Sequence, residues 1–292
     1  MKEQLTTLLS SATRTVAIGR DRPTVIIGER INPTGKRWLA EALLAGDMSP
    51  VAREALAQVE AGADVIDINI GAAGVDEARV LPLAVRAAME AVDVPLSLDS
   101  ANPEALRAAL GVYRGKALVN SVSGEEASLE RVLPLVGEYG AAVVGLTMDE
   151  GGIPSDPVER LRIAEKIVAR AEGYGIPRED VVIDCLALTV GADHRAALVT
   201  LEAVRLVARE LGVNQTLGAS NVSFGLPERG VINAAFLALA IAAGVTCPIV
   251  DAAKARPFVL AVDLLLGRDE YAMRYIKHYR RRKGSSATLS KT

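Results

Sequence analysis

The 292-residue sequence predicts an α/β fold, specifically a (β/α)8 TIM barrel. Short β-branched or apolar runs alternate with longer segments of helical period, which is the pattern of repeated βα units. Eight such runs occur, and no linker rich in Pro, Gly or Ser separates them. We therefore expect one domain over residues 1–292, with a barrel core at about 24–267, an N-terminal extension at 1–23 and a C-terminal helix and tail at 268–292.

The eight strands are expected at residues 24–31, 63–71, 95–100, 117–122, 141–148, 181–186, 216–223 and 247–252. Ser49, Asn102 and Asp156 each precede a proline, and we expect them to cap the helices that start there. A doubly wound sheet is the alternative fold. It is less well supported because GERINPTG, after the first strand, lacks the G-x-G-x-x-G spacing of a dinucleotide site.

The two ends of the chain are expected to add short elements to this barrel. Residues 1–23 should fold across its bottom, residues 269–283 should form a last helix, and residues 283–292 should form a solvated tail. The basic run from Arg280 to Lys283 could bind an acidic partner. We prefer the simpler interpretation, a charged helix end that the helix dipole favours.

The composition and the net charge exclude several classes of protein. Apolar residues make up 50% and charged residues 24%, which excludes a disordered chain, and the net charge of −3 argues against a nucleic-acid-binding protein. Two cysteines and two histidines are too few for a disulfide framework or a His-rich metal site, so we expect no bound metal. No apolar run reaches the about 18 residues of a membrane span. These observations predict a reduced, cytoplasmic protein that contacts neither nucleic acid nor membrane.

Polar side chains end nearly every expected strand, where the active sites of such barrels are built. A single Asx residue there often only caps a helix, but a full set converging on one rim predicts a polar ligand. The loop after the eighth strand has no glycine, which disfavours phosphate. Carboxylates here could hold Mg²⁺, or they could pair with a heterocycle such as a pterin or purine. The residues are Glu29, Asn32, Asp67, Asn69, Asp99, Ser100, Asn120, Ser121, Thr147, Asp149, Asp184, Ser220, Asn221 and Asp251.

Eight segments, in order along the chain, carry a resemblance to a known family. They are IIGERIN (26–32), GADVIDINIG (62–71), LSLDS (96–100), ALVNS (117–121), AAVVGLTMDEGGIP (141–154), VVIDCL (181–186), GASNVSFG (218–225) and RGVIN (229–233). Together the segments resemble the methyltetrahydrofolate:corrinoid-protein methyltransferases. That family is similar to dihydropteroate synthase and to the folate domain of cobalamin-dependent methionine synthase, with which it shares a pterin-binding barrel.

The resemblance implies roles for individual residues. Asp99, Asn120 and Asp184 would hydrogen-bond the pterin ring, and Asn221 would lie near N5 of the folate as the catalytic residue. Arg229 would contact the folate glutamate tail or the substrate side of the cavity. The other residues implied in substrate binding are Glu29, Asp67, Asn69 and Ser220.

The activity that the resemblance implies is methyl transfer between N5 of (methyl)tetrahydrofolate and the cobalt of a corrinoid, in a direction that the sequence does not set. A separate corrinoid protein would supply the corrinoid, because this chain lacks the D-x-H-x-x-G motif and has Asp193 and His194 adjacent. The resemblance also implies a homodimer. A dihydropteroate synthase-like enzyme is disfavoured because GASNVSFG stands where those enzymes carry Ser-Arg-Lys. A non-catalytic folate-binding barrel is the other alternative.

Overall fold

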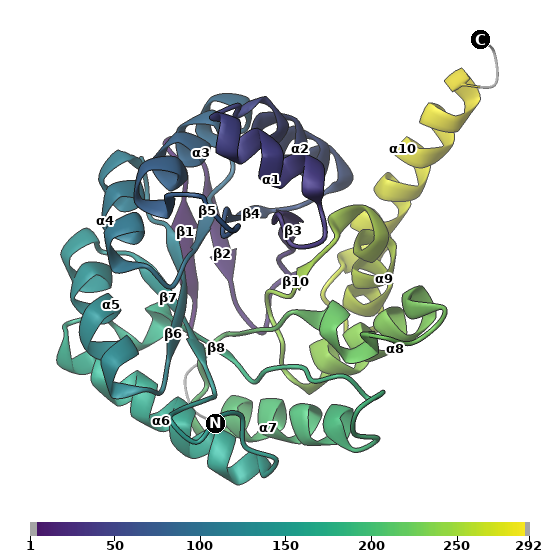
Figure 1. Cartoon of the computed structure of the whole chain (residues 1–292). Coiled ribbons are helices and arrows are strands. Elements are labelled where there is room, and N and C mark those ends of the chain that lie inside the picture. Colours follow the sequence, from purple (N-terminus) through teal and green to yellow (C-terminus); the bar gives the residue numbers. More distant parts are fainter. Residues whose placement is uncertain (1–4, 290–292) are drawn as a thin grey trace.

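The computed structural model describes residues 5–289, with side chains to residue 283, and its strands form a parallel barrel (Figure 1). Strand β10 pairs with β3, and the sheet then runs in chain order to β9. A parallel bridge between Gly218 and Ile249 closes the ring, so the predicted (β/α)8 TIM barrel is confirmed. The strands are β3 (Ile27–Ile31), β4 (Val65–Asn69), β5 (Leu96–Asp99), β6 (Leu118–Ser123), β7 (Ala142–Leu146), β8 (Val181–Asp184), β9 (Gln215–Thr216) and β10 (Ile249–Val250).

Helices surround the barrel and turn their apolar faces to it (Figure 1). On α6 the buried residues Ala164, Ile167 and Val168 recur at the three- and four-residue spacing of one helix face. The helices are α1 (Arg37–Ala45), α2 (Ser49–Ala61), α3 (Glu77–Ala91), α4 (Pro103–Val112), α5 (Glu126–Tyr139), α6 (Pro157–Gly173), α7 (Ala196–Glu210), α8 (Arg229–Ala243), α9 (Ala252–Leu265) and α10 (Met273–Leu289).

Two of the three expected helix caps are confirmed. Asn102 accepts hydrogen bonds from the backbone of α4, and Asp156 accepts one from the backbone of α6. The prediction for Ser49 is wrong, because α2 already begins at that residue. Asp47, two residues earlier, accepts from the Ser49 backbone N–H at 2.9 Å and forms the turn that leads into the helix.

The last two strands are much shorter than predicted. The expected strand at 216–223 ends at Thr216 in β9, and Ala219–Ser223 form a 3₁₀ helix, η2. The expected strand at 247–252 keeps only Ile249–Val250 in β10, because Pro248 has no N–H to donate and α9 begins at Ala252. The chain therefore leaves the barrel wall early at this seam, and η2 lies at the rim.

A hairpin closes the bottom of the barrel, where the N-terminal extension was expected. Strands β1 (Thr7–Ser10) and β2 (Thr15–Ile18) pair antiparallel and lie behind the barrel strands in Figure 1. Leu9 and Ile18 are fully buried against the apolar residues at the lower ends of the barrel strands. The Ser10 N–H donates to Lys116 O and the Lys116 N–H donates to Ser10 O, each at 3.0 Å, which fixes the hairpin beside β6.

Alternation along each strand separates the interior of the barrel from its outer face. On β4, Ile66 and Ile68 pack toward the helices, whereas Val65, Asp67 and Asn69 belong to the interior side. The lower interior is apolar, and the same alternation makes the upper interior polar. The position of the polar residues thus follows directly from the period of two in the strands.

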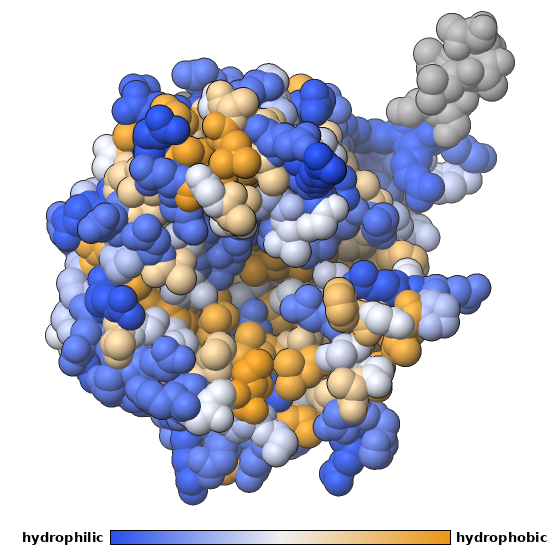
Figure 2. Space-filling view, viewed as in Figure 1, coloured by the Kyte–Doolittle hydropathy of each residue, from blue (hydrophilic) through white to orange (hydrophobic). Residues whose placement is uncertain are grey.

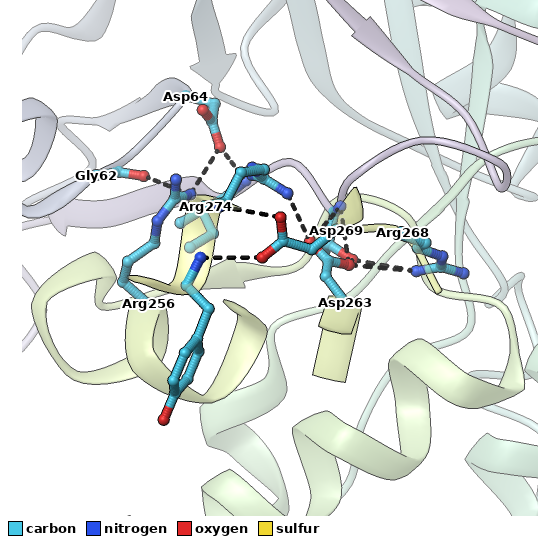
Figure 3. A network of polar contacts seen from close by, with 10 residues as sticks. Gly62, Asp64, Arg256, Asp263, Arg268, Asp269 and Arg274 are labelled. Atoms are coloured by element: carbon cyan, nitrogen blue, oxygen red, sulfur yellow. Dashed lines mark hydrogen bonds and ion pairs between the residues drawn. The ribbon is translucent and has the colours of Figure 1, made fainter. Parts of the chain in front are cut away.

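The C-terminal segment is held by the polar network of Figure 3. Asp263 accepts from the Thr24 N–H and from Arg274 Nη1 at 3.0 Å, and Asp269 accepts from the backbone N–H of Arg274 and of Tyr275 at 2.9 Å. These bonds fix the start of α10, which then extends away from the barrel (Figure 1).

Helix α10 differs from the helix predicted at 269–283. It begins at Met273, where the Asp269 carboxylate accepts from backbone N–H groups of its first turn, and it continues to Leu289. The basic run therefore lies inside the helix and not at its end. Most of the predicted tail is therefore helical, and residues 290–292 lie outside the described residues. Among residues 5–289, none of the helices combines the length and the apolar character that crossing a membrane requires.

Candidate active site

Three neighbouring strands place polar side chains in contact inside the upper barrel. Asp67 on β4 accepts from Ser97 Oγ at 2.6 Å and from Asn120 Nδ2 at 3.1 Å. The register explains this contact, because Asp67 is directly opposite Ser97 and each points inward. The sequence predicts Asp67 and Asn120 as site residues but not Ser97, because Ser97 lies within a strand and not at its end.

A second pair lies one step higher on the same strands. Asn69 Nδ2 donates to Asp99 Oδ2 at 2.9 Å, and Asp99 is opposite both Asn69 and Asn120 in the sheet register. Burial raises the pKa of both Asp67 and Asp99, and the charge of Asp99 raises the pKa of Asp67 further. The two carboxyls therefore hold protons to a higher pH than exposed aspartates do.

Asp184 ends β8 on the other side of the barrel and is buried. Its Oδ1 accepts from the Leu186 N–H at 2.6 Å. Burial raises its pKa to about 7, although the Leu186 hydrogen bond and the charge of Arg160 both lower it. This carboxyl changes its charge near neutral pH, where a bound ligand with N–H donors would favour the ionised form.

The side chains just described form a polar layer inside the barrel, which consists of Asp67, Asn69, Ser97, Asp99, Asn120 and Asp184. A cavity of about 880 Å³ lies beside this polar layer. The loop after β3, the 3₁₀ helix η2, the start of α8 and the β10–α9 junction surround it, and Figure 2 shows this end of the molecule hollowed at the mouth of the barrel. Six of its lining residues were predicted from the sequence: Glu29, Asn32, Ser220, Asn221, Arg229 and Asp251. The polar residues Lys36, Asn233 and Lys254, which were not predicted, also line it.

The turn that carries Asn221 is fixed by a small polar cluster. Arg229 Nη2 donates to Ser220 O at 2.8 Å, and Arg229 Nε donates to Ser223 Oγ at 3.0 Å. Ser223 Oγ in turn donates to Asn233 Oδ1 at 2.6 Å. The Arg229 guanidinium therefore holds η2 in place and also lines the cavity, and its expected contact with the folate tail or the substrate side stays a prediction.

Glu29 connects the cavity with the polar layer electrostatically. Burial and the neighbouring charge of Asp251 raise the pKa of Glu29, whereas the Lys36 ammonium lowers it. The charge of Glu29 in turn raises the pKa of Asp67. Lys36 Nζ donates to Arg30 O, which fixes the loop after β3 beside these carboxyls. The predicted site residues thus form two adjacent groups, one inside the barrel and one around the cavity.

Arg160, which is buried on α6, is a second residue at this site that the strand-end pattern does not predict. Its Nη1 donates to Cys185 O at 2.6 Å and to Leu186 O at 2.9 Å, directly after Asp184. A signal for it was present, because Arg160 falls on the helix face of Ala164 and Ile167, where a charged residue is unusual.

The polar layer offers carboxylate and amide acceptors together with amide and hydroxyl donors. A ligand that presents ring N–H and exocyclic NH₂ donors beside a carbonyl would satisfy such a set. Within the described part of the chain, no group of three or more His, Cys, Asp or Glu side chains is arranged to hold a metal ion.

Two known proteins are similar to this chain in sequence. The chain is 30% identical over 269 residues to the methylcorrinoid:tetrahydrofolate methyltransferase of Eubacterium limosum, covering 89% of this chain and 97% of that protein. It is 34% identical over 263 residues to the methionine synthase of Mycobacterium tuberculosis, covering 85% of this chain but only 22% of that larger protein.

Solved structures of dihydropteroate synthases share the fold at lower identity. The Xanthomonas albilineans enzyme in complex with 7,8-dihydropteroate has a TM-score of 0.64 at 23% identity, covering 89% of this chain and 98% of that chain. The Yersinia pestis enzyme has a TM-score of 0.66 at 18% identity, covering 91% of this chain and 100% of that chain. The family profile described as pterin binding enzyme matches residues 28–251, and this chain therefore belongs to the pterin-binding enzyme family.

Proposed function

We propose that this chain transfers a methyl group between N5 of (methyl)tetrahydrofolate and the cobalt of a corrinoid that a separate corrinoid protein carries. The observation that carries the proposal is the position of Asn221, which lines the cavity next to the polar layer of Asp67, Asp99, Asn120 and Asp184. The relative from E. limosum, which matches over 97% of its length, supports the same reaction.

The polar layer would recognise the pterin ring. The carboxylates of Asp99 and Asp184 would accept from the ring N–H and the exocyclic amino group, and the amide of Asn120 can both donate and accept. Buried charge-assisted hydrogen bonds of this kind are about twice as strong as neutral ones. A ligand that supplies the donors would also relieve the unfavourable burial of these carboxyls.

Asn221 would act on N5 itself. When the methyl group leaves N5, electron density returns to that nitrogen, and a hydrogen-bond donor aimed at it lowers the barrier. The Asn221 amide can donate in this way without being an acid. The corrinoid cobalt, as the second substrate, is the methyl acceptor or donor, and the chain contributes by holding the two reactants in line.

Binding and transfer can be tested separately. We expect methyltetrahydrofolate to bind the chain alone in calorimetry, and we expect its methyl group to move to added cob(I)alamin under anaerobic, reducing conditions, followed by visible absorbance. Asn221→Ala should lower the transfer rate about 100-fold and weaken folate binding much less. Equal losses in binding and rate would mean that Asn221 is only a binding residue.

Two other outcomes would redirect the proposal. Tight folate binding without any transfer would identify a non-catalytic folate-binding barrel. Condensation of a pterin with p-aminobenzoate would identify a dihydropteroate synthase-like enzyme. The homodimer and the cytoplasmic location stay predictions, of which sedimentation of the purified chain tests the first.

A further inference from the structure

Arg160 presents a buried charge that the proposed reaction does not use. The residue is 1% exposed, and within the described part of the chain no carboxylate lies in ion-pair distance of it. Its guanidinium instead donates to backbone carbonyls, with Nε bonded to Pro154 O at 2.8 Å and Nη1 bonded to Cys185 O and Leu186 O at 2.6 and 2.9 Å. Because burying a guanidinium without a carboxylate is costly, these contacts call for a function.

The two contacts of Nη1 hold the backbone that directly follows Asp184. Leu186 adopts a φ of 58°, a left-handed conformation that costs a non-glycine residue about 1 kcal/mol or more. In that conformation its N–H points back and donates to Asp184 Oδ1 at 2.6 Å, while its carbonyl accepts from Arg160. Thr200 on α7 also donates to Leu186 O, at 3.0 Å, so two helices fix the same peptide.

We propose that Arg160 is a positioning residue for substrate binding, which fixes the Asp184 carboxyl at the barrel interior through Leu186 and favours its ionised, hydrogen-bond-accepting form. The chain of contacts runs from the guanidinium to the Leu186 carbonyl and from the Leu186 N–H to the carboxylate. That Asp184 contacts the substrate rests on the proposed function; the coupling between Arg160 and Asp184 does not.

Arg160 is the charged side chain that acts on the pKa of Asp184. The groups that act on it or respond to its charge are Arg160 from α6, the Cys185 thiol on its own segment and the Cys247 thiol before β10. Burial raises the pKa of the Cys185 thiol and raises that of Cys247 to about 12, so both thiols are neutral near pH 7. Removal of the guanidinium would therefore raise the pKa of Asp184.

Carbon NMR of the ligand-free protein measures this coupling directly. The Asp184 carboxyl signal is assigned by its loss in Asp184→Asn, and its titration is compared in wild type, Arg160→Met and Arg160→Lys. We expect Arg160→Met to move the midpoint upward by about one pH unit and Arg160→Lys to keep it near wild type. Arg162→Met is the matched control, because Arg162 lies on the same helix with a side chain that is 66% exposed.

Calorimetric binding of methyltetrahydrofolate gives the second measurement. Since the ionised carboxylate accepts from the pterin, Arg160→Met should bind about fivefold more weakly at neutral pH and should recover at higher pH. Thr200→Val removes one hydrogen bond to Leu186 O but keeps the Arg160 charge, so it should weaken binding without changing the midpoint of the Asp184 titration. This variant replaces Arg160→Met in the test if Arg160→Met does not fold. An unchanged Asp184 titration in Arg160→Met, or in its place an unchanged affinity in Thr200→Val, would overturn the inference. Failure of wild type to bind folate would instead count against the proposed function.

Discussion

Replacing Asp184 by Asn should stabilise the ligand-free protein at neutral and higher pH. Asp184 is buried at the end of β8, and its folded-state pKa is raised to about 7 from the ordinary value of 3.8. A raised carboxyl pKa means that the folded chain holds a proton that the unfolded chain has released. The stability that the protonated Asp184 carboxyl contributes is therefore fully present below pH 3.8, and it is lost as the pH rises to about 7.

The size of the effect follows from the pKa difference. Each pKa unit corresponds to about 1.4 kcal/mol, so a shift of about three units costs the folded state about 4 kcal/mol above pH 7. Asn has the same shape, cannot ionise, and keeps an oxygen that accepts from the Leu186 N–H. The stabilisation by Asp184→Asn should grow from about 1.5 kcal/mol at pH 5 to about 4 kcal/mol at pH 8.

Urea unfolding at several pH values, followed by far-UV circular dichroism, measures this difference. Asp193→Asn is the control, because Asp193 lies on the loop after β8 with a side chain that is 56% exposed. Its stability should match wild type to within about 0.5 kcal/mol at each pH. A difference between Asp184→Asn and wild type that does not change with pH, or a loss of stability at pH 8, would show that burial does not raise the pKa of Asp184. The same variant should bind methyltetrahydrofolate weakly.

Three further substitutions test how the ends of the barrel are held. Leu9→Ala should destabilise the protein by about 2–5 kcal/mol in urea, because Leu9 is fully buried in the hairpin; a loss below about 1 kcal/mol would contradict that packing. Gly115→Ala should be at least as damaging, because a Cβ there would lie 2.2 Å from Ser10 O and φ is 127°, and wild-type thermal stability would disprove the close approach. Asp263→Ala should speed proteolysis of the C-terminal segment, because Arg268 and Arg274 lose their shared carboxylate; an unchanged cleavage pattern would argue against the anchor.

The period of the strands made much of this architecture predictable. Once Val65, Asp67 and Asn69 are placed on one face of a strand, the polar upper interior follows without any tertiary information. The contact between Asp67 and Ser97 did not follow, since it depends on the register between β4 and β5. The register is set by the packing of the whole sheet, so the sequence of either strand alone does not predict it.

Other features lie beyond local pattern for similar reasons. Arg160 was hidden because its partners are backbone carbonyls, which every residue has. The polar segment Ala219–Ser223 leaves the sheet as η2 because Arg229 and Asn233, later in the chain, bond to it. The extra length of α10 reflects helix propagation through residues that also suit a tail.

The seam between β9 and β10 gives the barrel wall an uneven resistance to opening. Each of these strands has two residues, whereas β4 and β5 pair over four positions. Between β9 and β10 the described residues form a single parallel bridge, Gly218 with Ile249, whereas the strands that carry Asp67 and Asp99 pair along four positions. Because Asn221 and Asp251 flank this seam, a local opening of the wall there would change the shape of the cavity while the strands that carry Asp67 and Asp99 stay paired.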